Sequence, residues 1–346
     1  MRRPLPFFAV TVMTSMAVAC SDGRPSASSE TSTSSGDADA GATSTSRVDG
    51  GEEQDGGRDG AVDGDDVDPL ACPPVEGEAL PETILCQPDA VWRSPVRVSL
   101  SDGDDTLAAV SGDERTIAWF HVGGPSPELL VADRPDVAED FGAPQVVSPP
   151  GGMFGARAAL SPDGLQLVVV SPDQRRLVVL TRTAHGEAFE LAEEGTAAAV
   201  QLAQLNAMLA ELPDGHGVDD PVWSKDGAEF LFSVTSPDGA TIHAATRTGS
   251  GAFGAAAARD DCELATHGVG ASRRPTAMSA DGLTLFYFDE ARSRERAAFR
   301  AKRDAPFSVF VDLGERVAAQ PNASCDALWS VRATTAGSSE VIRETR

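Results

Sequence analysis

Short apolar runs separated by polar turns occupy most of the chain, and residues 160–173 show the pattern most clearly. There Ser-Pro-Asp-Gly at 161–164 stands between Leu160 and the run Leu-Gln-Leu-Val-Val-Val that ends at Val170. Proline presets φ, aspartate accepts backbone hydrogen bonds and glycine accepts a positive φ, so this tetrapeptide is typical of a tight turn. The run after it is short and rich in β-branched residues, and a second turn follows at 171–173. It therefore predicts a buried β-strand rather than a helix.

Imperfect copies of this unit recur at a nearly constant interval. In each copy a serine opens the turn, and an aromatic residue 28 to 30 positions later begins a final strand. The serines are Ser111, Ser161, Ser224 and Ser279, and the aromatic residues are Phe141, Phe189, Phe253 and Phe307. Between them an arginine ends the third strand, at Arg134, Arg182, Arg247 and Arg300. A fixed period of strands and turns indicates a repeat fold.

Each unit is predicted to be an antiparallel sheet of four strands. In the second unit these strands are expected at 157–160, 165–170, 177–180 and 189–191. Middle strands such as Leu283–Phe288 are apolar on both faces. A sheet has two apolar faces only if both are covered, as they are when sheets stack radially around an axis. The units are therefore predicted to be the blades of a β-propeller.

Two partial units at the ends of the repeat region complement each other. Residues 92–98 match the final strand of a blade, whereas 327–331 and 339–341 supply early strands without a final aromatic strand. Together they would form a fifth blade, and closure of this kind removes exposed sheet edges. We therefore predict an all-β, five-bladed β-propeller over residues 92–346, with six blades as the alternative. The Ala- and Leu-rich interruption at 197–212 is a candidate for a short helix packed on the outside.

The amino terminus has the features of a secretory signal. A basic start is followed by an apolar segment, residues 5–18, that is too short to span a bilayer. The segment ends in Ala-Val-Ala-Cys, which resembles the lipobox of bacterial lipoproteins. The resemblance implies that residues 1–19 are a signal peptide and that Cys20 is acylated; simple secretion is the alternative. Because Ser21 resembles an outer-membrane sorting signal, we expect a lipoprotein at the outer membrane, on the periplasmic face or the cell surface.

Residues 20–71 contain mainly Ser, Thr, Gly, Ala and Asp and have almost nothing to bury, so they are predicted to form a disordered acidic linker. The aspartates at 59–68 lack the spacing and the final glutamate of an EF-hand, so a calcium site is not expected. The net charge of −25 argues against nucleic acid as a partner, because phosphates would be repelled. No second apolar segment is long enough for a transmembrane helix, so we expect membrane contact through the lipid alone.

Four cysteines remain once Cys20 carries lipid. An even number in an oxidising compartment indicates disulfides, and the spacing favours Cys72 with Cys86 and Cys262 with Cys325. The first pair lies in a Pro-rich lead-in at 72–91. Because no Cys-x-x-Cys and no Cys/His spacing typical of zinc occurs, neither a metal nor a cofactor is expected.

The turn motifs taken together resemble a known repeat. Ser-Pro-Asp-Gly at 161–164, Ser-Lys-Asp-Gly at 224–227 and Ser-Ala-Asp-Gly at 279–282, with Asp-Pro-Val-Trp before the second, are similar to the WD-like repeats of TolB-type β-propellers. The step from Arg247 to Phe253 is similar to a subgroup found in secreted bacterial lipoproteins. The resemblance covers about residues 92–346 and implies a non-enzymatic module that binds protein partners in the cell envelope. We expect a monomer.

No catalytic constellation is predicted. Asp163, Asp226 and Asp281 occupy the same turn position in different blades, so symmetry keeps them apart and each should accept turn N–H bonds. TolB-type propellers also cap serine hydrolases, but those enzymes need a Gly-x-Ser-x-Gly elbow, and this sequence has none. The alternative from another class is a carbohydrate-active propeller enzyme or a glycan-binding protein. The enzyme would need two channel carboxylates about 5–10 Å apart.

The segments just before the innermost strands are expected to line one mouth of the central channel. By the register above they are Asp104-Asp105, Met153-Phe154, Asp219-Asp220, Arg273-Arg274 and Asp326. In the functional interpretation, Arg273 and Arg274 offer donors to a partner carboxylate beside an apolar pair. In the alternative interpretation the charges only solvate the rim. The candidate binding residues are therefore Asp219, Asp220, Arg273, Arg274 and Asp326.

Overall fold

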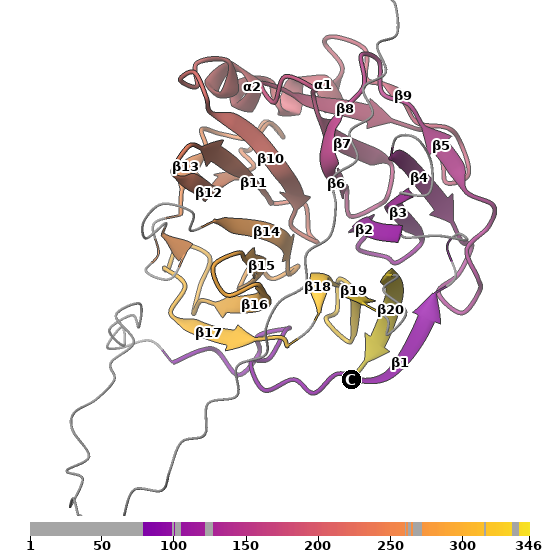
Figure 1. The fold of residues 1–346 in the computed structure, drawn as a ribbon, viewed down its shortest axis with the longest axis vertical. Helices are drawn as coiled ribbons and strands as arrows, with labels where there is room; N and C mark the ends of the chain where they lie inside the picture. Colours follow the sequence, from indigo (N-terminus) through magenta and orange to yellow (C-terminus); the bar gives the residue numbers. More distant parts are fainter. Residues whose placement is uncertain are drawn as a thin grey trace, which may run out of the picture. The chain divides into compact units, whose positions relative to one another are not determined.

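The computed structural model describes residues 79–346 apart from 99, 101–104, 122–126, 260, 262–263, 266–271, 315 and 334–338. The described residues form twenty β-strands in five antiparallel sheets of four strands each. Figure 1 shows the five sheets standing around a common centre. The predicted all-β, five-bladed β-propeller is confirmed, and the six-bladed alternative is wrong. The predicted signal peptide, Cys20 and the acidic linker lie outside the described residues.

Four blades are continuous in sequence. The first contains β2 (Asp105–Val110), β3 (Thr116–His121), β4 (Glu128–Asp133) and β5 (Gln145–Val147). The second contains β6 (Phe154–Leu160), β7 (Gln166–Val170), β8 (Leu177–Thr181) and β9 (Glu190–Leu191). The third contains β10 (Gly217–Trp223), β11 (Glu229–Ser236), β12 (Gly239–Thr246) and β13 (Ala257–Ala258). The fourth contains β14 (Arg273–Met278), β15 (Thr284–Asp289), β16 (Arg294–Phe299) and β17 (Val309–Asp312).

The fifth blade combines strands from both ends of the propeller. It contains β18 (Val317–Pro321), β19 (Ala327–Ala333), β20 (Ser339–Thr345) and, as the outermost strand, β1 (Arg93–Val98). Val98 of β1 stands opposite Val341 of β20, so the predicted closure of the ring by residues 92–98 is confirmed. One part of the prediction is wrong. Residues 327–331 belong to the second strand of this blade, because the short run Val-Ala-Ala-Gln-Pro of β18 forms the innermost one.

Serine and aspartate build the first turn of each continuous blade. In the second blade Ser161 Oγ donates to Asp163 Oδ1 at 2.5 Å, and the same oxygen accepts the N–H of Leu165 at 3.1 Å. Equivalent bonds form at Asp226 and Asp281. Each carboxylate thus satisfies its own turn, and the predicted structural role of these aspartates is confirmed.

Arginine and an aromatic residue join the third and fourth strands of each blade. In the four continuous blades the guanidinium carbon of the arginine lies 4.5 to 5.1 Å from the centre of the aromatic ring, a cation–π arrangement. In the fifth blade Arg346 lies 5.3 Å from the ring of Trp92. Arg346 and Trp92 therefore form in the fifth blade the arginine–aromatic pair that each other blade carries within one segment.

The fourth position of each first turn has a positive φ. Glycine holds it in three blades, with φ of 67° at Gly164, whereas Glu114 (φ 57°) holds it in the first blade and Cys325 (φ 55°) in the fifth. A side chain in this conformation costs about 1 kcal/mol or more. Both residues make bonds that offset this cost: Glu114 accepts hydrogen bonds from Trp329 Nε1 and Arg343 Nε of the fifth blade, and Cys325 forms a disulfide.

The disulfide joins Cys86 to Cys325, 239 residues apart, with the two Cα atoms 5.3 Å from each other. The predicted pairs Cys72–Cys86 and Cys262–Cys325 are therefore wrong, and Cys72 and Cys262 themselves lie outside the described residues. The reason is the path of the lead-in over the fourth blade. Leu85 N donates to Asp281 Oδ2 at 2.7 Å, and Cys86 O accepts from Thr284 Oγ1 at 3.3 Å. These bonds hold Cys86 beside the turn between β18 and β19.

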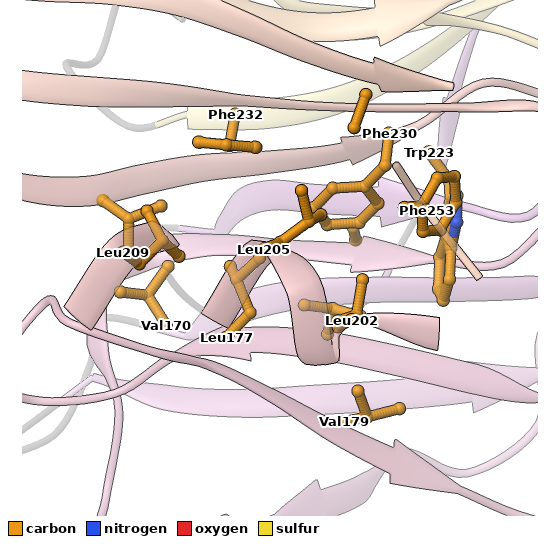
Figure 2. Close-up of a cluster of buried hydrophobic side chains, with 14 of the residues drawn as sticks. Val170, Leu177, Val179, Leu202, Leu205, Leu209, Trp223, Phe230, Phe232 and Phe253 are labelled. Atoms are coloured by element: carbon orange, nitrogen blue, oxygen red, sulfur yellow. The ribbon is translucent and has the colours of Figure 1, made fainter. Parts of the chain in front are cut away.

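The interruption at 197–212 forms two helices, α1 (Ala197–Gln201) and α2 (Ala203–Ala210). Three leucines of this segment, Leu202, Leu205 and Leu209, are fully buried. Figure 2 shows them against apolar side chains of the second and third blades, including Leu177 and Phe230. Each buried leucine stabilises the fold by roughly 1.5–3 kcal/mol, so the helices fill the space between two blades. Among the described residues no helix combines the length and the apolar character needed to cross a membrane.

Candidate functional site at the mouth of the channel

The propeller has two different ends because its five innermost strands all run in one direction. We call the end where these strands begin the mouth face and the end where they turn into the second strands the turn face. On the mouth face Arg157 of β6 reaches Asp220 of β10. On the turn face Gly112 N donates to Pro162 O at 2.9 Å, which joins the first turns of two neighbouring blades.

Between the two faces the channel is narrow. Small side chains of the innermost strands line it, among them Ala108, Ala158 and Ala277, and the free space there is about 20 Å³. Towards the turn face the side chain of Lys225 crosses the channel, and its Nζ donates to Val110 O. Burial lowers the pKa of Lys225 to about 8. Among the described residues the middle of the channel is thus filled, and the mouth face is the side from which a partner could reach the charged groups there.

The candidate site is a cluster of ion pairs on the mouth face, at the starts of β10 and β14. Arg274 Nη1 lies 3.2 Å from Asp219 Oδ2 and 3.4 Å from Asp220 Oδ2. Its Nε donates to Glu290 Oε1 at 2.5 Å, and Arg157 Nε lies 3.3 Å from Asp220 Oδ1. Three carboxylates thus share two guanidinium groups, and the cluster spans the second, third and fourth blades.

Asp220 is the most constrained member of this cluster. It is 1% exposed, has a φ of 47°, and lies in the β-bulge between Asp219 and Val222. Burial raises the pKa of Asp220 to about 6, although the positive charge of Arg157 opposes this shift. Gly155, with a φ of 72°, leaves room on the neighbouring strand, because a Cβ there would lie 3.2 Å from Asp219 Oδ1. The bulge therefore turns two successive carboxylates towards the channel at a point where charge is poorly solvated.

A second buried carboxylate lies near the same face, between the fourth and fifth blades. Glu295 of β16 accepts a hydrogen bond from Thr276 Oγ1, and its Oε2 accepts the N–H of Ala318 at 3.1 Å. Burial raises the pKa of Glu295 to about 7, against the effect of the bond from Thr276. The mouth face thus contains two carboxyl groups that gain a proton more readily than ordinary ones.

Of the five predicted binding residues, the structure brings three together. Asp219, Asp220 and Arg274 meet in the cluster, but Arg273 is 2% exposed and turns to the other side of its strand. There its Nη1 lies 3.2 Å from Asp289 Oδ1. Arg273 and Arg274 therefore do not form one pair of donors, because successive residues of a strand point to opposite sides.

Asp326 lies on the turn face, so its predicted place at the mouth is wrong. It follows β18 and precedes β19, and its N–H and side chain are both bonded to Asn322. The hydrogen bond from Asn322 lowers the pKa of Asp326. The prediction shifted this residue by a whole strand because it treated 327–331 as innermost.

The remaining predicted rim residues are only partly described. Asp105 is 5% exposed and lies 3.3 Å from His121 Nδ1, within the first blade. Met153 is partly buried against the core between the first and second blades. Asp104 and the side chain of Phe154 lie outside the described residues. The expected apolar patch beside the arginines therefore stays a prediction.

Two members of the cluster, Arg157 and Glu290, were missed by the sequence analysis. Arg157 precedes Ser161 by four positions, and Asp220 precedes Ser224 by the same four. When the units are aligned on their turn serines, Arg157 and Asp220 therefore occupy equivalent positions, and this equivalence could have indicated the ion pair. Glu290 follows β15 and had no such marker, because it reaches Arg274 only through the pairing of β14 with β15.

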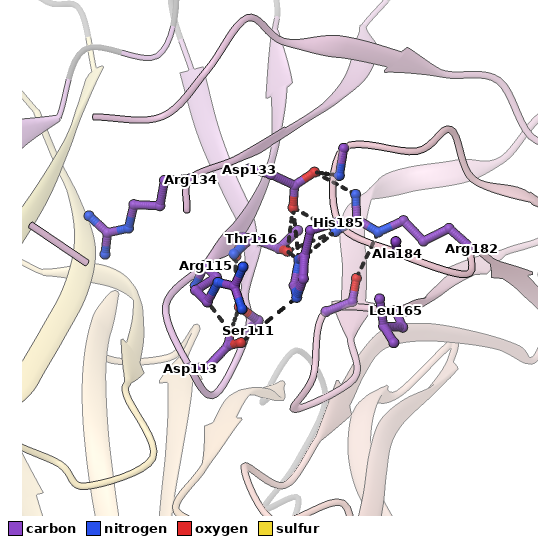
Figure 3. Close-up of polar contacts among 12 residues, drawn as sticks. Ser111, Asp113, Arg115, Thr116, Asp133, Arg134, Leu165, Arg182, Ala184 and His185 are labelled. Atoms are coloured by element: carbon purple, nitrogen blue, oxygen red, sulfur yellow. Dashed lines mark hydrogen bonds and ion pairs between the residues drawn. The ribbon is translucent and has the colours of Figure 1, made fainter. Parts of the chain in front are cut away.

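On the turn face a second polar cluster joins the first and second blades (Figure 3). Both Nη atoms of Arg182 lie 2.6 Å from oxygens of Asp133, Thr116 Oγ1 donates to Asp133 Oδ1 at 2.6 Å, and His185 Nδ1 lies 3.0 Å from Thr116 Oγ1. Burial would raise the pKa of Asp133, but the bonds from Arg182, Thr116 and Gly186 N lower it to about 2. Thr116 is fully buried, and its hydroxyl group donates a hydrogen bond to the carboxylate of Asp133. This cluster therefore joins two blades and does not have the arrangement of a catalytic triad.

Within the described ranges, no group of three or more His, Cys, Asp or Glu side chains is arranged to hold a metal ion. His185 belongs to the tie on the turn face, His121 contacts Asp105, and His243 stacks on Phe232. His216 is half-buried, and His267 lies outside the described residues. The described histidines thus lie in different blades or connections.

The similarity of this chain to known proteins is weak. No family description matches the chain. No curated protein matches it either. Among solved structures, it is similar to a putative TolB from Agrobacterium tumefaciens, with 14% identity and a TM-score of 0.37 over 66% of this chain and 69% of that one. TolB from Acinetobacter baumannii gives 12% identity and a TM-score of 0.41 over 70% of this chain and 55% of that one, so this chain spans about half of that protein.

A third similar structure is the PQQ-bound aldose sugar dehydrogenase from Streptomyces coelicolor, with 17% identity and a TM-score of 0.36 over 71% of this chain and 81% of that one. Similarity at these levels carries no conclusion of its own. The order of strands in the five sheets makes the protein a β-propeller, the fold predicted from its turns.

Proposed function

We propose that this protein is a lipid-anchored propeller of the bacterial cell envelope that acts as a non-enzymatic protein-binding module, with the mouth face as its contact surface. The observation that carries the proposal is the ion-paired cluster around Arg274. Its side chains are held in position by bonds to one another, which lowers the entropy cost of ordering them when a partner binds. Other polar clusters of the propeller, such as that of Asp133, are consumed in joining blades.

The charges of the cluster define the kind of partner. Asp219, Asp220 and Glu290 carry three negative charges against the two positive charges of Arg157 and Arg274. The side chains of Arg274 and Glu290 are the accessible ones, 31% and 33% exposed. A protein surface that presents a basic side chain next to an acidic one would pair with both, and complementary charges of this kind favour specificity and fast association.

A carbohydrate-active enzyme is the alternative function. Glycoside hydrolysis needs a general acid and a second carboxylate on either side of the bond to be cleaved. Asp219 and Asp220 are 7% and 1% exposed and are covered by Arg274, so neither has a path to a sugar ring. We therefore favour binding over catalysis.

The location in the envelope has two supports. Disulfides form and persist in oxidising compartments, and Cys86–Cys325 is such a bond. The apolar segment that ends in Ala-Val-Ala-Cys20 supports the lipid anchor. Metabolic labelling with a fatty-acid analogue should mark the wild-type protein and leave Cys20→Ala unmarked. Labelling that persists in Cys20→Ala would contradict the anchor without affecting the binding proposal.

Site-specific photo-crosslinking tests the contact surface. A photoreactive amino acid at the exposed position 238, in the turn between β11 and β12, places the probe on the mouth face and leaves Arg274 and Glu290 unchanged. The matched control is position 304, an exposed acidic residue in the connection from β16 to β17 on the turn face. In intact envelopes we expect a discrete protein adduct from position 238 and none from position 304.

The double variant Arg274→Ala/Glu290→Ala, with the probe at the same position 238, should lose this adduct. Equal adducts from positions 238 and 304, or an adduct that survives the double variant, would place the contact elsewhere. Release of sugar from envelope polysaccharide by the wild-type protein, abolished by Asp220→Asn, would favour the enzyme instead.

A further inference from the structure

A cavity lies between the lead-in and the outer part of the fourth blade, away from the mouth face. Its volume is about 240 Å³. The lead-in and the residue after it supply one wall, with residues 86–88 and 90–92, and strands β15 to β17 supply the other, with Phe286, Phe299 and Val311. Cys86 in the first wall is joined by the disulfide to Cys325 of the fifth blade, so both walls are fixed to the propeller.

The lining of this cavity is mainly apolar. Trp92, Phe286 and Phe299 contribute aromatic surface, and Val311 and Leu313 contribute aliphatic surface. Ligand sites typically combine such a lining with a few polar groups that fix orientation. At the roughly 30 Å³ that one water molecule occupies in the liquid, the cavity has the volume of about eight water molecules, which suits a short ligand chain.

Two charged side chains, Asp312 and Arg316, line the cavity itself. Each is already paired, Asp312 with Arg294 and Arg296 and Arg316 with Glu344. A further arginine lies next to the lining, because the guanidinium group of Arg346 lies 5.3 Å from the ring of Trp92.

Arg346 is the arginine best placed to meet a ligand. It is exposed, and within the described part of the chain its Nη2 donates to Leu85 O at 2.9 Å, which leaves Nε and Nη1 for a further acceptor. The stacking on Trp92 holds the group beside the cavity rather than in bulk water. A carboxylate at this point would gain a charge-assisted hydrogen bond from a guanidinium that is already positioned.

We propose that this cavity binds a small amphiphile: an acyl or aryl chain of about eight carbon atoms lies in the cavity, and its carboxylate lies beside Arg346. The lead-in is then a wall of a binding site in addition to closing the ring. This site is independent of the mouth face, so either proposal can fail alone.

The test uses three probes with the same chain and different heads: octanoate, octylammonium and 1-octanol. Binding to the full chain is measured by calorimetry and by the change in tryptophan fluorescence, since Trp92 lines the cavity. We expect octanoate to bind with a stoichiometry of one and at least tenfold more tightly than octylammonium, with 1-octanol in between. Equal affinities of octanoate and octylammonium would overturn the assignment of the head group.

Two variants separate the chain from the head. Ala90 is half-buried and lines the cavity, so the larger side chain of Ala90→Phe should fill the cavity. We expect this variant to weaken the binding of octanoate and of 1-octanol at least tenfold. Arg346→Gln should lower the affinity for octanoate three- to tenfold and leave the affinity for 1-octanol unchanged. The control is Arg97→Gln on β1, whose side chain is 70% exposed and lies outside the cavity lining; it should change neither affinity.

Folding of each variant is checked by its melting temperature. Octanoate affinity within twofold of wild type in a folded Ala90→Phe variant would overturn the proposal. If Ala90→Phe does not fold, Arg346→Gln still tests the proposal. An equal loss of affinity for octanoate and 1-octanol, or no loss of affinity for octanoate, would contradict a carboxylate beside Arg346.

Discussion

Buried carboxylates on the two faces of the propeller have pKa values that are shifted in opposite directions. On the turn face, hydrogen bonds from Arg182 and Thr116 outweigh burial and lower the pKa of Asp133 to about 2. Bonds from Arg343 and Trp329 likewise outweigh burial at Glu114 and lower its pKa. On the mouth face burial prevails, and the pKa of Asp220 rises to about 6.

This difference separates structure from candidate function. Charges on the turn face recur from blade to blade and serve turns and ties between blades, so they stabilise the ring. Charges on the mouth face differ from blade to blade. Buried atoms without a well-aligned hydrogen bond occur on both faces, at Arg300 Nη1 on the turn face and at Asp220 Oδ1 on the mouth face, so the contrast lies in the direction of the carboxylate pKa shifts. Since perturbed carboxylates collect at functional sites more often than elsewhere, the mouth face is the better place to search for a partner.

The strongest test of the comparison is Glu114→Ala on the turn face. Glu114 is buried and accepts bonds from Trp329, Asn322 and Arg343 of the fifth blade. Its removal leaves a partly buried guanidinium unpaired, so we expect unfolding in urea to lose about 3–5 kcal/mol. The control Glu128→Ala, at an exposed position, should lose less than about 0.5 kcal/mol. A loss below about 1 kcal/mol at Glu114 would mean that the ring does not depend on this tie.

The next largest effect should come from the disulfide. Cys86→Ser removes the covalent link between the lead-in and the fifth blade, and loss of such a bond costs about 2–4 kcal/mol. Non-reducing peptide mapping of the secreted protein should recover a Cys86–Cys325 peptide. A thiol at both positions in the oxidised protein would contradict this link.

The pH dependence of stability should differ between the faces. The pKa of Asp220 is raised in the folded state from 3.8 to about 6, so its contribution is fully present below pH 3.8 and is lost as the pH rises through 6. The pKa of Asp133 is lowered from 3.8 to about 2, so its contribution is present above pH 3.8 and is lost as the pH falls through 2. Each change amounts to at most about 3 kcal/mol.

Urea midpoints measured between pH 2 and pH 7 check this prediction. Asp220→Asn should flatten the decline between pH 4 and 6, whereas Asp133→Asn should flatten the decline below pH 4. A wild-type stability that rises steadily from pH 4 to 6 would show that Asp220 is ionised without penalty, and the contrast between the faces would be lost.

The smallest effect is expected at the turn aspartates. Asp163→Ala removes one bond from Ser161 and one from the backbone and should cost about 1 kcal/mol. Asp281→Ala should cost more, because Asp281 also accepts the N–H of Leu85 in the lead-in. Thermal unfolding of the two variants measures the difference, and equal losses would indicate that the lead-in adds nothing at this turn.

The architecture could be predicted because the motifs that define each repeat lie close together in the sequence. A serine, an aspartate two positions later and an arginine followed by an aromatic residue define a blade within one segment, and residues 92–98 carried enough of that pattern to reveal the closure. β18 was missed because the turn after it has Asn322 and Cys325 where the second, third and fourth blades have serine and glycine. Those exceptions occur where the turn also serves the ring.

The candidate site was less predictable because its contacts cross between blades. Asp219, Asp220 and Arg274 were chosen from an expected place just before an innermost strand, whereas they lie within β10 and β14. Which arginine meets the two aspartates depends on the bulge at Asp220 and on the alternation along β14. The pairing of Cys86 with Cys325 was beyond reach for a similar reason. It depends on the path of the lead-in over Asp281 and Thr284, and no local pattern in the sequence records that path.

The position of Cys86 seven residues before β1 also determines how the propeller bears mechanical load. A force applied to the chain upstream of Cys86 passes through the disulfide to Cys325 in the fifth blade, and the strand that closes the ring lies behind this covalent clamp. β1 would therefore not be peeled from β20 by tension on the amino-terminal side. Once the disulfide is reduced, the same force acts on β1 directly, and the closing strand becomes the first element to detach.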